Sequence, residues 1–206
     1  MDKMKKEAIT RILFVVFLVI FTAWIASMLQ FWQGCAGLRQ DVLRLHILAN
    51  SDTAEDQQLK LLVRDEVLAH WDSWLPEGGT KDDMMAYIDE NIQNVEQVAA
   101  ETLQKVGCNL PVKATLARSF FDTRVYEETV MPAGWYDALQ ITIGSGAGKN
   151  WWCVLYPPLC LPAAEGDAVL SLLSPEEQAV VTSPPRYQIR FLTVELVEEL
   201  GRWLRR

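Results

Sequence analysis

The most suggestive chemistry in this 206-residue sequence is a glycine-rich run at residues 144–150, GSGAGKN. Glycines let backbone N–H groups approach a phosphate, and a lysine beside them adds positive charge. Two positions depart from a phosphate-binding loop: Asn150 stands where a magnesium-binding Ser or Thr is needed, and Ile143 stands where the first glycine belongs. The apolar residues at 151–154 also continue as a strand rather than a helix. We therefore expect a hairpin turn here, and no small-molecule substrate.

The two histidines are the next candidates, because a nucleophile relay would need a base such as His46 or His70 near a serine, threonine or cysteine. His70 lies in a predicted amphipathic helix and is expected at the surface. His46 shares one face of a predicted strand with Arg44, so we expect it to be partly exposed. The main prediction is that the chain has no catalytic residue and is not an enzyme. One alternative stays open: a secreted hydrolase that uses His46 with Asp52 or with a thiol such as Cys153.

The four cysteines suggest a disulfide rather than a metal site. Cys153 and Cys160 flank a loop that contains prolines at 157–158, where a turn could bring the two Cα atoms within bonding range. We predict a Cys153–Cys160 bridge; the alternative is that these two and Cys108 are free thiols. The sequence has no C-x2-C pair, and neither histidine shows ligand spacing. No metal and no cofactor are therefore expected.

The composition limits the class of protein. The length suits one globular domain plus a targeting segment. Half of the residues are hydrophobic, which supports a core, and the net charge is -8 with a pI near 4.8. Because nucleic-acid-binding domains normally carry a basic patch, we expect no nucleic acid as a partner.

The N-terminal segment predicts a membrane interaction. Residues 12–29 are uncharged and apolar, and as a helix they would be about 27 Å long, close to the roughly 30 Å bilayer core. The preceding residues are basic, which places the start in the cytoplasm and the rest outside. We predict a signal peptide or membrane anchor over 1–37 and an exported domain over 38–206. Cleavage after Ala36 and a retained anchor are equally compatible with the sequence.

The elements that must position these residues follow from periodicity. Residues 42–49 alternate as in a half-buried strand, and an amphipathic helix begins at Thr53. A second helix is expected, with Thr80 or Asp82 as its N-cap and Gly107 as its C-cap. Further strands are predicted at 112–118, 124–131, 137–143, 151–156 and 186–192, with helices from Ser174 and over 194–204. This pattern predicts an α+β fold in which an antiparallel meander is flanked by helices.

Several strings together resemble the stage II sporulation protein R family of endospore-forming bacteria, over roughly residues 40–161. The residues that carry the resemblance are LRLHILANSD at 43–52, EDQ at 55–57 with LKLLVRD at 59–65, PAGWYDAL at 132–139 and GKNWWCVLYPPLC at 148–160.

The resemblance implies a signalling protein that is secreted or membrane-anchored in the space between the forespore and mother-cell membranes. Its implied partner is the membrane-embedded aspartic protease that processes pro-sigma-E in the mother cell. A purely structural envelope protein is a third, weaker hypothesis. The residues expected to contact the partner are Asn50, Asp52, Arg64, Trp135, Tyr136, Asn150, Trp151 and Trp152.

Overall fold

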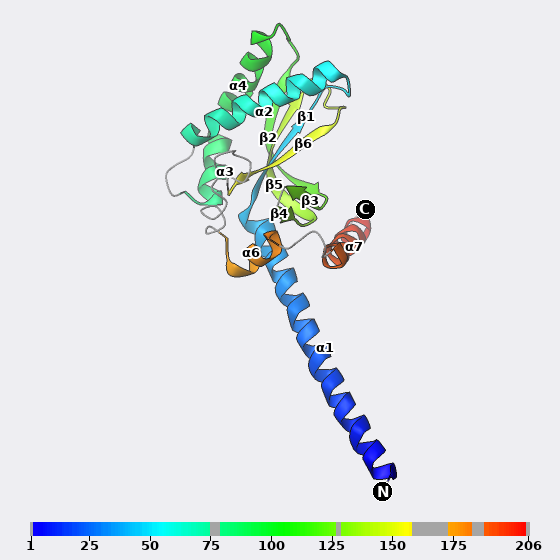
Figure 1. Cartoon of the computed structure of the whole chain (residues 1–206). Coiled ribbons are helices and arrows are strands. Elements are labelled where there is room, and N and C mark those ends of the chain that lie inside the picture. The colour runs from blue at the N-terminus through cyan, green and yellow to red at the C-terminus, as the bar shows by residue number, and fades with distance from the viewer. Residues whose placement is uncertain (1, 75–78, 127–128, 158–172, 183–187, 205–206) are drawn as a thin grey trace. The chain divides into compact units, whose positions relative to one another are not determined.

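A computed structural model describes the whole chain except residues 1, 75–78, 127–128, 158–172, 183–187 and 205–206 (Figure 1). The chain divides into two compact units. We call residues 38–122 and 134–173 the sheet unit, and residues 1–37, 123–133 and 174–206 the helical unit.

The sheet unit is built on four strands in the order β2-β5-β1-β6. The α+β class is confirmed, and β2–β5 and β1–β6 are antiparallel pairs. The meander is wrong, however, because β1 lies parallel to β5 and is inserted between β5 and β6. The strands are β1 (Leu43–Leu48), β2 (Val112–Phe121), β5 (Gly134–Ile143) and β6 (Asn150–Tyr156).

Helices cover one face of this sheet. Helices α2 (Ala54–Trp74) and α4 (Ile92–Lys105) lie over it in Figure 1. Alternate residues of β1 face the helices, because successive side chains of a strand point to opposite sides. The central buried side chains of this core are Leu43, Leu45, Ile47, Val63, Val67, Trp71, Val95, Ala99, Leu103, Leu139 and Ile141.

The predicted second helix is two helices, α3 (Lys81–Glu90) and α4, with a break at Asn91. The predicted start is confirmed, since Thr80 forms a capping box with Asp83. The predicted end is also confirmed: Gly107 has a φ of 79°, a conformation that glycine adopts without strain. Lys81 fixes α3 to the sheet, because its ammonium group is paired with the Asp137 carboxylate.

The described part of the helical unit contains three helices and a short hairpin. The strand expected over 124–131 is a hairpin of two short strands, and the helix expected at Ser174 is confirmed by a capping box. The strand expected over 186–192 is wrong for its described part, because residues from 188 onward are helical and bury Phe191 and Val194 on one side. The elements are α1 (Asp2–Asp41), β3 (Arg124–Tyr126), β4 (Thr129–Met131), α6 (Pro175–Val181) and α7 (Gln188–Leu204).

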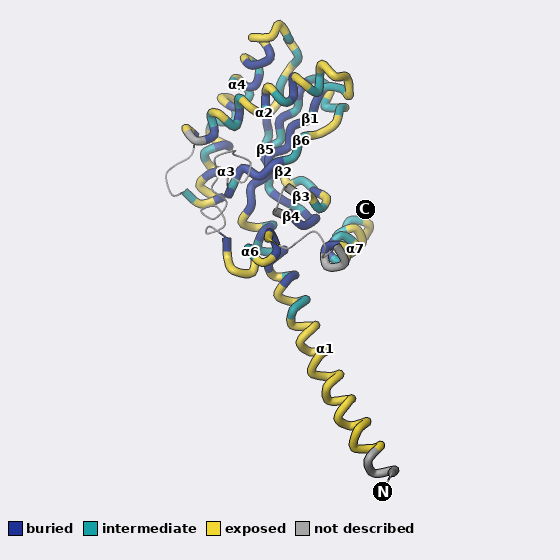
Figure 2. The backbone as a smooth tube through the Cα atoms, in the orientation of Figure 1, coloured by how far each residue is buried: buried dark blue, intermediate teal, exposed yellow. Residues whose placement is uncertain are grey.

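Helix α1 contains the predicted membrane segment. Its part over 6–41 is long and apolar enough to cross a bilayer, and no part of its most apolar 18-residue window is buried. Figure 2 shows most of α1 exposed, with buried residues only toward its C-terminal end. The N-terminal helix therefore fits a signal sequence or an anchor.

Residues 31–37 of α1 are packed within the helical unit. Phe31 and Cys35 are buried, and Gly34 lies so close to α6 that a Cβ atom there would be 2.6 Å from the Glu176 carbonyl oxygen. A Cβ atom at Gly37 would meet the Glu177 side chain at 2.5 Å. The two glycines thus let α6 pack against the backbone of α1. Cleavage after Ala36 would remove this packing surface.

Candidate functional site

Two loops interlock at the carboxyl end of β1. The loop from β5 to β6 crosses this end, because β1 lies between those two strands. The Asn50 side-chain oxygen accepts a hydrogen bond from the Ser145 N–H (3.0 Å), and the Asp52 carboxylate accepts one from the Lys149 N–H (2.6 Å). We call this network the polar clasp; its members are Asn50, Ser51, Asp52, Asp56, Gln57, Lys60 and residues 144–149. The hairpin turn predicted here is wrong, since β5 and β6 are not paired with each other.

The backbone of the glycine-rich run supplies hydrogen-bond donors to the clasp. All six backbone N–H groups from 144 to 149 donate within the protein: to the carbonyl oxygens of residues 111, 143, 50 and 49 and to the side chains of Asn50 and Asp52. A Cβ atom at Gly148 would lie 2.2 Å from the Ser51 carbonyl oxygen, so only glycine fits there. With all six committed, the loop has no backbone N–H group left to bind a phosphate.

The first turns of α2 complete the clasp. Asp56 accepts hydrogen bonds from Ser51 Oγ and from Asn50 Nδ2, and these bonds lower the pKa of Asp56. Lys60 donates to Gln57 Oε1 at 2.6 Å and to the Lys149 carbonyl oxygen at 3.0 Å. Burial lowers the pKa of Lys60. Gln57 and Lys60 lie in the strings that carry the resemblance, but neither was expected in the site. Lys60 contacts a loop that is distant along the chain, and Gln57 joins Lys60 to the Ser51 carbonyl oxygen.

Arg64 and Trp151 lie next to the clasp, on the helix-covered side of the sheet. The guanidinium carbon of Arg64 is 4.4 Å from the centre of the Trp151 ring, within cation–π range. Arg64 also forms an ion pair with Asp65 at 2.6 Å. Trp151 is half-buried and packs against the core.

An aromatic stack occupies the other face of the sheet. The rings of His46 and Trp152 are nearly parallel, with centroids 3.8 Å apart, and Phe121 meets Trp152 edge to face at 4.6 Å. The expectation that His46 is partly exposed is wrong: it is only 7% exposed, because these rings cover it. Burial lowers the pKa of His46 to about 4, opposed by the Asn150 side chain and assisted by the charge of Arg44. His46 is therefore neutral at pH 7.

The parts of the alternative hydrolase are not assembled. Asp52 binds the Lys149 N–H, and Cys153 lies in the core on the helix-covered face, away from His46. Among the described residues, no hydroxyl, thiol or carboxylate lies in hydrogen-bonding geometry with either ring nitrogen of His46. The geometry thus gives His46 no nucleophile to activate and no carboxylate to orient it.

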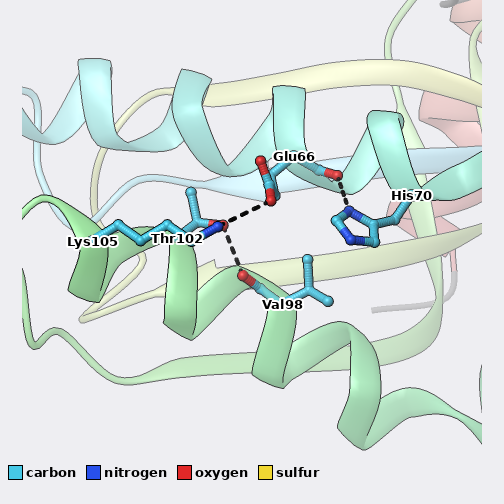
Figure 3. A network of polar contacts seen from close by, with 5 residues as sticks. All are labelled: Glu66, His70, Val98, Thr102 and Lys105. Carbon is cyan, nitrogen blue, oxygen red and sulfur yellow. Dashed lines mark hydrogen bonds and ion pairs between the residues drawn. The ribbon is translucent and has the colours of Figure 1, made fainter.

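His70 has a structural setting as well (Figure 3). Its Nδ1 lies 2.9 Å from the Glu66 carbonyl oxygen of the preceding helical turn, an arrangement in which Nδ1 donates. The Glu66 carboxylate is 3.3 Å from the Lys105 ammonium group, which links α2 to α4. Thr102 Oγ1 donates to the Val98 carbonyl oxygen within α4. His70 is half-buried rather than at the surface.

Trp135 and Tyr136 lie at the opposite end of the sheet. They begin β5, whereas the clasp lies beyond its last residue, about 25 Å away at 3.3 Å per residue. Tyr136 is completely buried beside Arg44, whose guanidinium carbon is 5.1 Å from its ring centre. Trp135 is half-buried and contacts Phe120 edge to face at 5.8 Å. The eight residues expected to contact a partner therefore do not form one patch; only Asn50, Asp52, Arg64, Asn150, Trp151 and Trp152 lie near one another.

The predicted disulfide depends on Cys160, which lies outside the described residues. Cys153 is buried, and Cys108 is a half-buried free thiol. The bridge stays a prediction. Over the ranges that the structure describes, no group of three His, Cys, Asp or Glu side chains could hold a metal ion.

Comparison with known proteins identifies the family. The family model for stage II sporulation protein R matches residues 39–165, more than half of the chain. Stage II sporulation protein R of Bacillus subtilis (strain 168) is 41% identical over 128 residues, which make up 62% of this chain and 57% of that protein. No solved structure matches. The matched range contains the polar clasp and the aromatic stack, and the chain belongs to the stage II sporulation protein R family.

Proposed function

We propose that this sporulation protein is an exported signal that activates the membrane-embedded aspartic protease that processes pro-sigma-E. The observation that carries the proposal is the family match over 39–165 in a chain that begins with a membrane-capable helix. The signal would act in the space between the forespore and mother-cell membranes. Its α1 segment would be retained as an anchor, because Phe31 and Gly34 are part of the folded helical unit.

The surface proposed to contact the protease is the exposed rim of the polar clasp. Asp52, Ser145, Lys149 and Asn150 are exposed there. Their backbone is fixed by the clasp hydrogen bonds, so little conformational entropy would be lost on binding. In this proposal Asn50 fixes the backbone of the rim through its hydrogen bond with Ser145. Arg64 and Trp151 pack behind the rim on one face of the sheet, and Trp152 packs behind it on the other face.

Activation requires that the signal bind the active form of the protease more tightly than the inactive form. Each tenfold difference in affinity corresponds to about 1.4 kcal/mol. In this proposal the rigid rim is complementary to the active arrangement of the protease and not to the inactive one.

The direct test reconstitutes the full chain and the protease together in vesicles and measures cleavage of pro-sigma-E. We expect cleavage to depend on the full chain and to fall at least tenfold with Asn150→Arg, which places a large cation on the rim. The matched control is Lys113→Glu, a charge change at an exposed residue of β2, which should cleave normally. Cleavage that is independent of the chain would refute the activation, and equal effects of both variants would refute the rim.

The genetic test deletes the gene and follows the same processing during sporulation. Deletion should block processing, and the full chain should restore it. A variant with Leu18→Arg and Phe21→Arg, which puts two charges into the apolar segment of α1, should not restore it. Normal processing in the deletion strain would contradict a signalling role.

A further inference from the structure

Helix α7 carries a continuous apolar stripe that the described part of the protein leaves uncovered. Its large apolar residues recur every three or four positions, as on one side of a helix. They are between 51% and 70% exposed. The stripe consists of Leu192, Leu196, Val197, Leu200, Trp203 and Leu204. Such a stripe on a protein surface marks a contact with a partner or a membrane.

The other side of α7 is attached to α1. Phe191 is buried, and its ring meets that of Phe31 edge to face, with centroids 5.2 Å apart and an interplanar angle of 77°. Phe31 follows directly on the exposed apolar run of α1, which extends to Leu29. The contact therefore holds the start of α7 at the level where the membrane-spanning stretch of α1 ends.

The composition of α7 suits a helix that lies in the plane of an interface. With 17 residues it is shorter than the roughly 20 needed to cross a bilayer. Glu195, Glu198 and Arg202 lie away from the apolar stripe and Glu199 lies at its edge. These charges would make a crossing orientation costly. Trp203, the most exposed aromatic residue of the stripe, is of a type enriched at membrane interfaces.

We propose that α7 lies in the lipid–water interface of the bilayer crossed by α1, with Leu196, Leu200 and Trp203 among the acyl chains. The proposal rests on α1 being the retained anchor of the proposed function. It does not depend on the protease. The helix lies outside the range that the family model matches, so this second membrane contact is a property of this chain rather than of the matched region. It would add a second attachment to the one that α1 provides.

The test uses the full chain in vesicles of phosphatidylethanolamine and phosphatidylglycerol. An environment-sensitive fluorescent amino acid is placed at Leu200, at Glu195 or at Phe17, which are exposed or partly exposed, so that each label should leave the fold intact. Positions 195 and 200 lie about 140° apart around a helix of 3.6 residues per turn. Quenching by spin-labelled lipid and by aqueous iodide is then compared. We expect the labels at Leu200 and Phe17 to be quenched several-fold more by the lipid than the label at Glu195, and the Glu195 label to be quenched more by iodide.

The three labels separate the possible failures. Lipid quenching at Phe17 with strong iodide quenching at Leu200 overturns the proposal for α7 and leaves the anchor intact. A Leu200 label that neither quencher reaches, together with crosslinks between two chains, shows a second copy on the stripe and also overturns it. No lipid quenching at Phe17 overturns the anchor, and the proposal for α7 with it.

Discussion

The two units of this protein use their side chains in opposite ways. In the sheet unit the polar groups near the clasp are committed to internal hydrogen bonds, and among its described residues only Leu62 and Val106 are large exposed apolar residues. In the helical unit most of the large apolar residues of α1 and α7 are exposed. The sheet unit thus encloses its apolar side chains, whereas the helical unit presents many of them at its surface, as a protein that contacts a partner or a membrane does. The family match covers most of the first unit and leaves out most of the second.

The largest expected loss of stability comes from adding a side chain in the sheet unit at Gly148, where the neighbouring backbone leaves no room for one. Gly148→Val places a side chain against the Ser51 carbonyl oxygen, where even a Cβ atom would be 2.2 Å away. We expect the free energy of unfolding of the sheet unit to fall by about 3–4 kcal/mol, since backbone must move. Chemical denaturation measures it.

The matched control is Gly107→Asn. A Cβ atom added at Gly107 would meet nothing within 4 Å, and asparagine tolerates the left-handed backbone conformation of this residue. This change should cost about 1 kcal/mol or less. Equal losses for the two variants would contradict a special role for the clasp.

The next effect should be confined to the helical unit. Gly34→Leu drives a side chain into the Glu176 carbonyl oxygen and the Val180 side chain, so α6 should detach from α1. We expect a local loss of about 2–3 kcal/mol, seen as faster amide hydrogen exchange over 175–181. Exchange in the sheet unit should not change.

Ala26→Leu is the control for that variant, because Ala26 is exposed on the same helix. It should leave exchange in α6 as it was. If Gly34→Leu accelerated exchange equally in β1 and β5, the two units would form one cooperative block and the contrast between them would fail.

A smaller effect is expected from pH. The pKa of His46 is about 4 in the folded protein and about 6.5 in the unfolded chain, so on acidification the unfolded chain takes up a proton first. Stability is therefore full above pH 7 and falls as the pH drops from 6.5 towards 4, by about 2 kcal/mol at pH 5 and about 3 kcal/mol at pH 4. Denaturation midpoints measured across this window give the value.

His46→Phe keeps a ring against Trp152 but does not titrate. Its stability should lose the slope between pH 6.5 and 4 that the unaltered protein shows. A His46→Phe protein with the same slope would place the proton uptake on another group.

The smallest effect concerns the cation–π pair beside the clasp. Arg64→Gln removes the charge over the Trp151 ring and should lower the free energy of unfolding by about 0.5–1 kcal/mol. Arg118→Gln, at an exposed position of β2, should change it by less. Indistinguishable variants would show that the Arg64 contact contributes nothing measurable.

Local features could be predicted from the sequence because neighbouring residues determine them. The caps at Thr80 and Ser174 and the apolar run of α1 are of this kind. The position of β1 could not be predicted, since its pairing with β5 joins residues that are distant in sequence. The glycine-rich run shows the same limit: its residue types suggested a turn, but only the fold shows that it crosses β1.

The candidate site was predicted in part for the same reason. The resemblance pointed to Asn50, Asp52 and Asn150, which the fold brings to one end of the sheet. It also pointed to Tyr136, which the fold buries completely. The type of a residue does not determine how far its side chain is exposed to solvent. The sequence therefore could not separate residues that form a surface from residues that support it.

The central place of β1 sets the order in which the sheet can be completed. Asn50 and its clasp partner Ser145 are 95 residues apart, and both neighbours of β1 are made long after it. During synthesis β1 therefore has no strand partner until β5 and β6 have emerged from the ribosome. A chain threaded through a translocation channel would emerge with β1 still unpaired, so the sheet could close only on the far side. In an exported chain, this topology would leave the sheet incomplete until β5 and β6 had followed β1 through the channel.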